Sequence, residues 1–209
     1  MKSLISFLCI LLLSPAVFAG ATVQDLQHQW AIANYQTAED DLDSVFTALI
    51  EQAETAVRSN PDDPELLIWQ GIIQSSYAGK AGGLGALGFV KAAKVSLEKA
   101  LELDDMAMAG SAYTSLGALY YQVPGWPIAF GSDKQARKLL EKAILINPDG
   151  LDSNYFYAEF LFEEKEYQKA KEVLGKAMNA TQRPGREVAD KGRREEIQKL
   201  LTKIDKKLS

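Results

Sequence analysis

Hydrophobic residues recur with the 3.6-residue period of amphipathic helices along the chain from about residue 24 onward. No segment shows the alternation of apolar and polar residues that is typical of a half-buried strand. Turn signals interrupt the helical pattern at three places: Asn60-Pro61-Asp62-Asp63, Leu103-Asp104-Asp105 and Asn147-Pro148-Asp149-Gly150. The pattern therefore predicts an all-α protein built from short helices that follow one another closely.

One helical pattern is repeated along the chain. The run Ala136-x3-Leu140-x2-Ala143, followed by Pro148, recurs 34 residues later from Ala170 and 43 residues earlier from Ala93. This spacing of helix-turn-helix units resembles the tetratricopeptide repeat. A first-helix signature of the same repeat occurs as Tyr113-x2-Leu116-Gly117-x2-Tyr120. Small residues at such positions allow the two helices of a hairpin to approach closely.

These repeats predict a right-handed superhelix of about four tetratricopeptide-like hairpins, because one hairpin cannot bury its apolar stripe alone. A final helix follows, in a tail whose residues 183–209 hold nine Lys or Arg against five Asp or Glu. We expect this helix to cap the open end of the array; the alternative is a basic surface for an acidic partner or a membrane. Residues 20–209 thus form one domain, with hairpins at about 24–60, 64–105, 106–148 and 151–180 and the last helix at about 186–208.

Two hairpins carry insertions between their first and second helices. Twelve residues usually separate the small residue of the first helix from the first repeated alanine of the second helix. The second hairpin has about ten residues more than this, and the third about seven. The first insertion, residues 79–88, is glycine-rich and apolar, and the second, residues 123–131, contains two prolines and two large aromatics. We expect two inserted loops side by side on one edge. They either fold back onto the body or form a lip over a binding cleft.

The inner helices of such an array line a concave groove. None of the groove positions indicated by the repeat phase is basic, which favours an apolar, aromatic groove that binds an amphipathic helix or an apolar small ligand. The alternative is that these side chains pack against the insertions. Thr114 and Ala118 lie at groove positions, and the candidate binding residues from the groove and the second insertion are Ile68, Ile72, Tyr121, Trp126, Phe130, Tyr155, Glu159 and Phe162.

Composition and charge exclude several classes of function. The net charge of −5 argues against a protein that binds a nucleic-acid backbone. The chain holds one histidine and one cysteine, too few for most metal, thiol or Ser-His-Asp sites. The glycine run is not a phosphate-binding loop, because Ala81 follows Lys80 and Gln74 stands where a glycine is needed. The acidic residues 39–43 lack the glycine-centred loop of a calcium site. We therefore expect that the protein is not an enzyme and that it binds neither a metal ion nor a cofactor.

The first 19 residues have the pattern of a secretory signal peptide. Lys2 precedes a ten-residue apolar run, Leu4 to Leu13, which is too short to span a membrane, and cleavage is expected after Ala19 or Ala21. Cys9 lies inside this run, so the mature chain has no thiol for a disulfide or a lipid anchor. We expect a periplasmic or secreted protein with no membrane span after cleavage.

The segment Leu116–Pro127, followed by Gly131 and the helix that ends at Pro148, resembles the T-component (TatT-like) proteins associated with TRAP transporters. The resemblance covers roughly residues 64–180. It implies a periplasmic tetratricopeptide-like protein that associates with a periplasmic solute-binding protein and holds an apolar ligand. The chain departs from that family in lacking a lipoprotein cysteine after the signal.

These observations predict a non-catalytic exported scaffold that binds a protein partner through the apolar groove and the inserted loops. The partner implied by the resemblance is a solute-binding component of a transporter. An alternative function is a carrier of a small apolar ligand, enclosed by the glycine-rich loop and the VPGW loop. A third is a homo-oligomer whose apolar loops form the interface. No nucleic-acid partner is expected.

Overall fold

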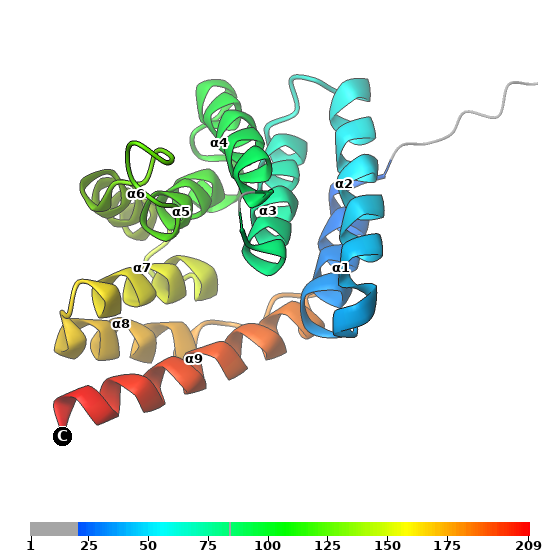
Figure 1. Cartoon of the computed structure of the whole chain (residues 1–209). Coiled ribbons are helices and arrows are strands. Elements are labelled where there is room, and N and C mark those ends of the chain that lie inside the picture. The colour runs from blue at the N-terminus through cyan, green and yellow to red at the C-terminus, as the bar shows by residue number, and fades with distance from the viewer. Residues whose placement is uncertain (1–20, 84) are drawn as a thin grey trace, which may run out of the picture.

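The described part of the chain, residues 21–83 and 85–209 of the computed structural model, is helical (Figure 1). Within it the only β-type pairing is an isolated bridge between Gly125 and Gly131. The predicted signal peptide lies outside the described residues. The all-α fold is confirmed, with helices α1 (Val23–Tyr35), α2 (Leu42–Ser59), α3 (Pro64–Ala81), α4 (Ala86–Leu103), α5 (Ala107–Gln122), α6 (Asp133–Ile146), α7 (Leu151–Glu163), α8 (Tyr167–Asn179) and α9 (Glu187–Leu208), and a 3-10 turn at Glu39–Asp41.

Consecutive helices pair into the hairpins α1–α2, α3–α4, α5–α6 and α7–α8, which stack into a helical solenoid (Figure 1). The first helices of the hairpins contact one another in the order α1, α3, α5 and α7. Helix α9 packs on α7 and α8, and it also runs back to contact α1 (Figure 1). The inner helices and α9 therefore form a closed ring rather than an open array.

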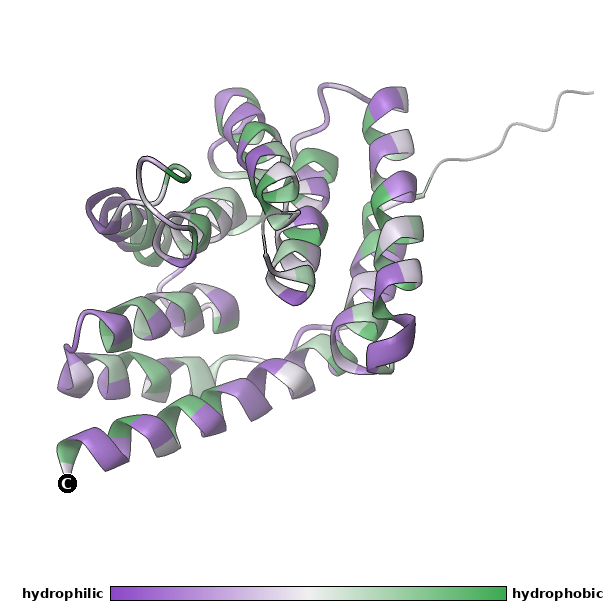
Figure 2. Ribbon diagram, viewed as in Figure 1, coloured by the Kyte–Doolittle hydropathy of each residue, from purple (hydrophilic) through white to green (hydrophobic). Residues whose placement is uncertain are grey.

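The repeated alanine and leucine positions form the interior of the hairpins. Leu97, Leu140 and Leu174 are completely buried, as are the alanines that precede them in the repeat. In Figure 2, apolar and polar segments alternate along α9, as expected of a helix with one buried face. The predicted solenoid is thus stabilised mainly by apolar burial between neighbouring helices.

Side chains at the helix starts explain where several helices begin. The Asp63 carboxylate accepts hydrogen bonds from the N–H groups of Glu65 and Leu66, at 2.9 and 3.1 Å, and Pro64 occupies the first helical position of α3. Ser132 caps α6 in the same way, its Oγ accepting from the Gln135 N–H at 3.4 Å. These local contacts fix the direction in which each helix leaves its turn.

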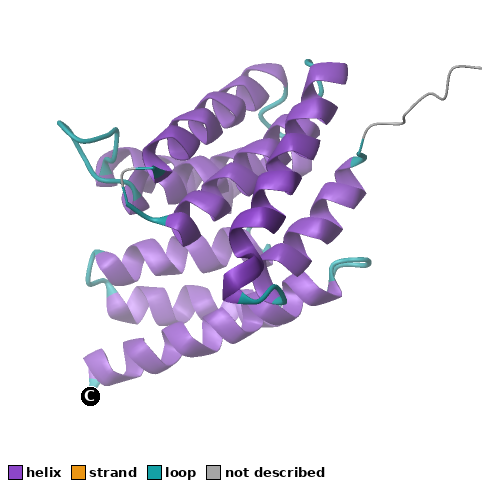
Figure 3. Ribbon diagram, turned by 45° about the vertical axis from the view of Figure 1, so that its right-hand side comes forward, coloured by secondary structure: helices purple, strands orange, loops and turns teal. Residues whose placement is uncertain are grey.

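The two insertions take different forms. The first lies between α3 and α4, but most of it is helical: both helices reach 18 residues, and residues 82–85 separate them. The alanines and large apolar residues around the glycines favour helix, and Gly82, with φ of 61°, ends α3. The second insertion is a loop, residues 123–132, between α5 and α6. Loops in the described chain are confined to connections between helices and to its two ends (teal in Figure 3). None of the described helices is both long enough and apolar enough to cross a bilayer.

Candidate functional site

The ring of inner helices surrounds a cavity of about 550 Å³. Its walls come from α1, α3, α5, α7 and α9 and from the segments before α7 and α9. This volume lies within the range of small-ligand sites, about 300–1,000 Å³. The cavity is therefore the candidate functional site.

Five of the eight predicted groove positions line this cavity. Ile72, Thr114, Ala118, Tyr155 and Glu159 are part of its wall. The other positions do not line it. Ile68 is completely buried in the hydrophobic core that α3, α4 and α5 share, Phe162 packs on Tyr167 with ring centroids 5.5 Å apart, and Tyr121 lies behind the wall, where its hydroxyl donates to Glu159.

The two aromatics of the 123–132 loop lie outside the cavity. Phe130 packs edge-to-face on Tyr120, with centroids 5.4 Å apart, and the Lys94 Nζ lies 5.7 Å from its ring. Trp126 is 90% exposed. Of the described residues that line the cavity, none belongs to 123–131, whereas Gly79 and Lys80 of the first insertion do line it. The VPGW loop therefore does not enclose the cavity.

The expectation of an apolar groove is wrong. Besides apolar side chains, the wall carries serines, asparagines, three carboxylates and four cationic side chains. Three of these cations, Arg183, Arg186 and Arg193, come from the basic tail, which lies outside the repeats. The repeat phase could not place them, because it assigns inward positions only within hairpins. The basic excess of the tail was the available signal, and the structure turns these three arginines toward the cavity.

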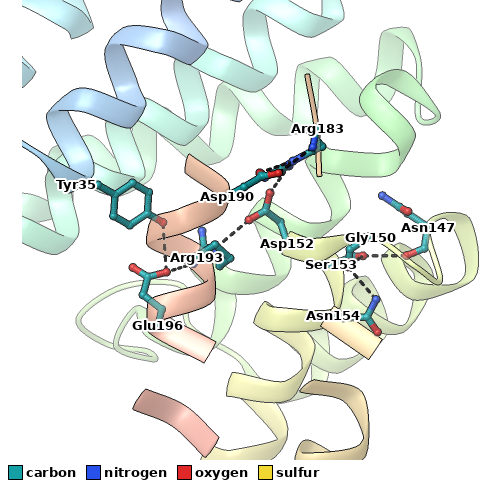
Figure 4. Close-up of polar contacts among 10 residues, drawn as sticks. All are labelled: Tyr35, Asn147, Gly150, Asp152, Ser153, Asn154, Arg183, Asp190, Arg193 and Glu196. Carbon is teal, nitrogen blue, oxygen red and sulfur yellow. Dashed lines mark hydrogen bonds and ion pairs between the residues drawn. The ribbon is translucent and has the colours of Figure 1, made fainter. Parts of the chain in front are cut away.

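Two of the arginines belong to a partly buried network of ion pairs (Figure 4). Asp152 accepts hydrogen bonds from Arg183 Nη1 at 2.7 Å and from Arg193 Nε at 2.8 Å. Asp190, which is 2% exposed, accepts from Arg183 Nη2 at 2.6 Å. Glu196 accepts from Arg193 Nη1 at 2.6 Å and from the Tyr35 hydroxyl at 3.3 Å. The network joins α7, α9 and α1 across one wall of the cavity.

Burial and neighbouring charges shift the pKa values of groups in this network and around Glu159. Burial alone would raise the pKa of the Asp152 carboxyl, but the neighbouring Arg193 and Arg183 hold it well below its ordinary value of 3.8. For Tyr121, burial and the charge of Glu159 raise the pKa well above the ordinary value of 10.0. Glu159 also accepts hydrogen bonds from Tyr155 at 2.9 Å and Gln122 at 3.1 Å. Its acceptor capacity is largely used by side chains of the protein itself.

The turn before α7 is fixed by side-chain bonds to its backbone (Figure 4). Ser153 Oγ donates to the Asn147 carbonyl at 2.8 Å. Asn154 Nδ2 donates to the carbonyls of Pro148 and Gly150, both at 2.8 Å. These bonds position Asp152 and place Asn147 at the cavity.

A strained backbone segment at the start of α5 forms another part of the wall. Met108 and Ala109, which both line the cavity, have φ of 49° and 52°, in the left-handed region. That conformation costs roughly 1–2 kcal/mol for each residue with a side chain. Gly110 continues the turn with φ of 72°, and a Cβ added there would meet the Ile146 side chain at 3.0 Å. Close packing on α6 therefore holds this strained turn in place.

Among the described residues, no group of three or more His, Cys, Asp or Glu side chains is arranged to hold a metal ion. His28 is exposed on α1 and does not line the cavity. The ionisable groups of the wall lie in ion pairs and hydrogen bonds, apart from Arg186. The cavity wall can therefore bind a charged ligand and neutralise the charge of that ligand.

Comparisons with known proteins give a family match and a likeness to solved structures. Residues 129–204 match the sequence model of the tetratricopeptide repeat family. The crystal structure of MamA is similar over 83% of this chain and 95% of the MamA chain, with a TM-score of 0.46 and 22% sequence identity. No curated protein shows significant similarity to the chain. The repeats seen in the sequence thus have family support from α6 to α9, and over that region the chain is similar to tetratricopeptide-repeat proteins.

Proposed function

We propose that the protein is a non-catalytic scaffold that binds a protein partner through the loop at residues 123–132, with Trp126 at the centre of the contact. The observation that carries this proposal is the 90% exposure of Trp126, next to Ile128, which is 59% exposed. Tryptophan is enriched among the residues that dominate binding energy at protein interfaces. Burial of an exposed indole by a partner removes apolar surface from water and so stabilises the complex.

The loop is ordered before any partner arrives. The Gly131 N–H donates to the Pro124 carbonyl at 3.0 Å, and the Ser132 N–H donates to the Tyr120 carbonyl at 2.7 Å. The N–H groups of Ile128 and Ala129 both donate to the Gly125 carbonyl. Phe130 packs against the body and anchors the loop. A loop that is already ordered loses little conformational entropy on binding.

The family match supports the same class of function, because tetratricopeptide-type scaffolds generally bind proteins and lack catalytic activity. We propose further that the predicted signal peptide exports the protein to the periplasm. Following the resemblance to the T-component proteins, we propose a solute-binding component of a transporter as the partner. A second copy of the chain is the competing occupant of the loop.

Photo-crosslinking tests the proposal. A benzophenone side chain is placed at Trp126, and a control is placed at Leu145, which is 79% exposed on α6. We expect the probe at 126 to crosslink one protein in native cells, and Ile128→Asp to abolish this product. A product that forms equally from position 145, or survives Ile128→Asp, contradicts the proposal. A crosslink to a second copy, together with concentration-dependent sedimentation, would identify an oligomer interface instead.

A further inference from the structure

The cationic side chains of the cavity differ in how they are paired. Arg183 and Arg193 each bind carboxylates, and Lys80 donates to the Asn34 carbonyl at 3.2 Å. The Arg186 side chain makes no hydrogen bond or ion pair with any of the described residues. All three carboxylates of the wall already accept hydrogen bonds from other side chains; they are Asp152, Glu159 and Glu196. Arg186 is therefore a half-buried guanidinium without an anionic partner in the wall of the cavity.

A second unpaired donor lies next to Arg186. Its guanidinium carbon lies over the Trp69 ring, 4.9 Å from the ring centre, at the distance of a cation–π contact. Trp69 lines the cavity and is 3% exposed, and its Nε1–H has no acceptor. The Arg186 Nε is also buried without a partner. By contrast, the Nε1–H of Trp30 in the same wall donates to Ser76 Oγ at 2.8 Å. Buried donors without an acceptor are rare in folded proteins, so two adjacent ones call for an explanation.

The electrostatic surroundings of Arg186 also favour the binding of an anion. Burial and the positive charge of Arg183 lower the pKa of Arg186, while Asp152, Asp190 and Tyr35 act in the opposite direction. Both of these aspartates are bound by Arg183, and Asp152 is bound by Arg193 as well. An anion beside Arg186 would offset the cost of keeping its guanidinium charged inside the protein.

We propose that Arg186 and Trp69 form an anion subsite in the cavity, which takes the carboxylate of a small organic acid. The planar guanidinium matches a carboxylate with two parallel hydrogen bonds, and the indole N–H supplies a third. The body of the acid lies against a wall that mixes apolar and hydroxyl groups, including Ile72, Phe156, Ser75 and Ser115. Because α9 closes the ring on α1, the space of about 550 Å³ suits a small molecule rather than a protein domain.

Access to the two donors requires a movement of one side chain. Both unpaired nitrogens are shielded in the free protein. No hydrogen bond holds the Arg186 guanidinium, so its side chain can rotate toward an anion that also accepts from the Trp69 N–H. The proposal does not depend on the scaffold function, because residues 123–131 contribute nothing to the wall.

Tryptophan fluorescence tests the subsite in the full mature chain. The Trp126→Phe background leaves Trp30 and Trp69, both in the cavity wall, as the fluorophores. The probe is 3-phenylpropionate, compared with the neutral 3-phenylpropionamide and with phenyl phosphate. We expect saturable binding of the carboxylate, and at least about tenfold weaker binding of the amide, since a charged hydrogen-bonded pair is lost. Arg186→Met should weaken carboxylate binding by a similar factor, and Arg186→Lys by less.

The matched control is Lys199→Gln, which removes the same charge from an exposed position of α9. It should bind the carboxylate like the parent protein. Circular dichroism verifies that each variant is folded. Trp69→Phe, followed by calorimetry, should weaken binding, because it removes the indole N–H but keeps an aromatic ring beneath the Arg186 guanidinium. The absence of saturable carboxylate binding at millimolar concentration, or equal affinity in Arg186→Met, would overturn the proposal. Tighter binding of phenyl phosphate would overturn the carboxylate assignment in favour of a phosphate ester.

Discussion

Asp152 is the residue on which the polar contacts of the cavity wall converge. It lies in the first turn of α7 and binds two arginines from the tail, Arg183 and Arg193. The Arg193 side chain is only 8% exposed, so its charge depends on these carboxylates for compensation. Arg186 is the exception in this wall, and the difference between paired and unpaired arginines is the basis for proposing an anion subsite.

The first prediction concerns this ion pair. Asp152→Asn should lower the free energy of unfolding at neutral pH by about 2–3 kcal/mol, because it leaves the buried Arg193 with one partner fewer. The loss is moderate because the Asp152 side chain is itself 32% exposed. Asp62→Asn is the matched control. It removes a carboxylate that is 78% exposed and pairs with Lys99 at the surface, and should have little effect.

The same pair predicts a pH dependence. The pKa of Asp152 in the folded protein lies below its ordinary value of 3.8, so its contribution to stability is fully present above that pH. The contribution is lost as the pH falls from there through the lowered folded pKa. Urea unfolding from about pH 7 to about pH 2 should therefore show a difference between the parent and Asp152→Asn that shrinks only below about pH 4. A difference that is constant across this range would contradict the assignment.

At the scale of the elements, the hairpins depend on glycine where two helices approach most closely. A Cβ at Gly71 would lie 2.6 Å from Leu97 Cγ, and a Cβ at Gly117 would lie 2.6 Å from Leu140 Cγ. The two contacts are equivalent in α3–α4 and α5–α6. The small residue of the repeat therefore has the same physical role in both hairpins, because any side chain there would push the second helix away.

Gly117→Ala should lower the free energy of unfolding by about 1–3 kcal/mol, since the added methyl overlaps a buried leucine. Gly175→Ala makes the same change in the middle of α8, where nothing lies within 4 Å of the added Cβ. There we expect a gain of about 0.5–1 kcal/mol from helix propensity. Thermal or urea unfolding of the two variants measures both effects. Two changes of the same sign would contradict the packing argument.

For the molecule as a whole, the decisive contact is the one between α9 and α1. It joins the last helix to the first hairpin and makes a ring of a linear array (Figure 1). The helices approach closely at Gly192, where a Cβ would lie 2.4 Å from Cδ1 of Tyr35. The Tyr35 hydroxyl donates to Glu196 one turn further along α9. Closure of the ring creates the cavity and brings the three arginines to it.

Gly192→Ala should loosen this contact, because the methyl group displaces the Tyr35 ring, although alanine favours the helix itself. We expect faster hydrogen exchange of the amides in α1, with little change in α5 to α8, since each hairpin is stabilised mainly by its neighbours. Gly175→Ala serves again as the control for a glycine replaced within a helix. Exchange that increases uniformly along the chain would indicate general destabilisation rather than opening of the ring.

The helices, the repeat and the inward position of residues such as Ile72 and Tyr155 could be predicted from the amino-acid sequence. These features depend on local rules: the apolar period, the turn residues, and the small residues at fixed spacing. The different environments of the two aromatic side chains in the 123–132 loop could not be predicted in this way. Phe130 and Trp126 are both large aromatics, and only the folded backbone determines that one packs against the body and the other lies in water.

The return of α9 to α1 was decided by the tertiary structure alone. A repeat pattern specifies how each hairpin contacts the next, whereas closure depends on small rotations that accumulate over four hairpins. No local sequence pattern indicates the total rotation over the four hairpins. The polar character of the cavity follows from that closure, because Arg183, Arg186 and Arg193 line it only when the tail crosses the ring. The sequence therefore determined the helices and their order, and the accumulated geometry of their packing determined what the cavity can bind.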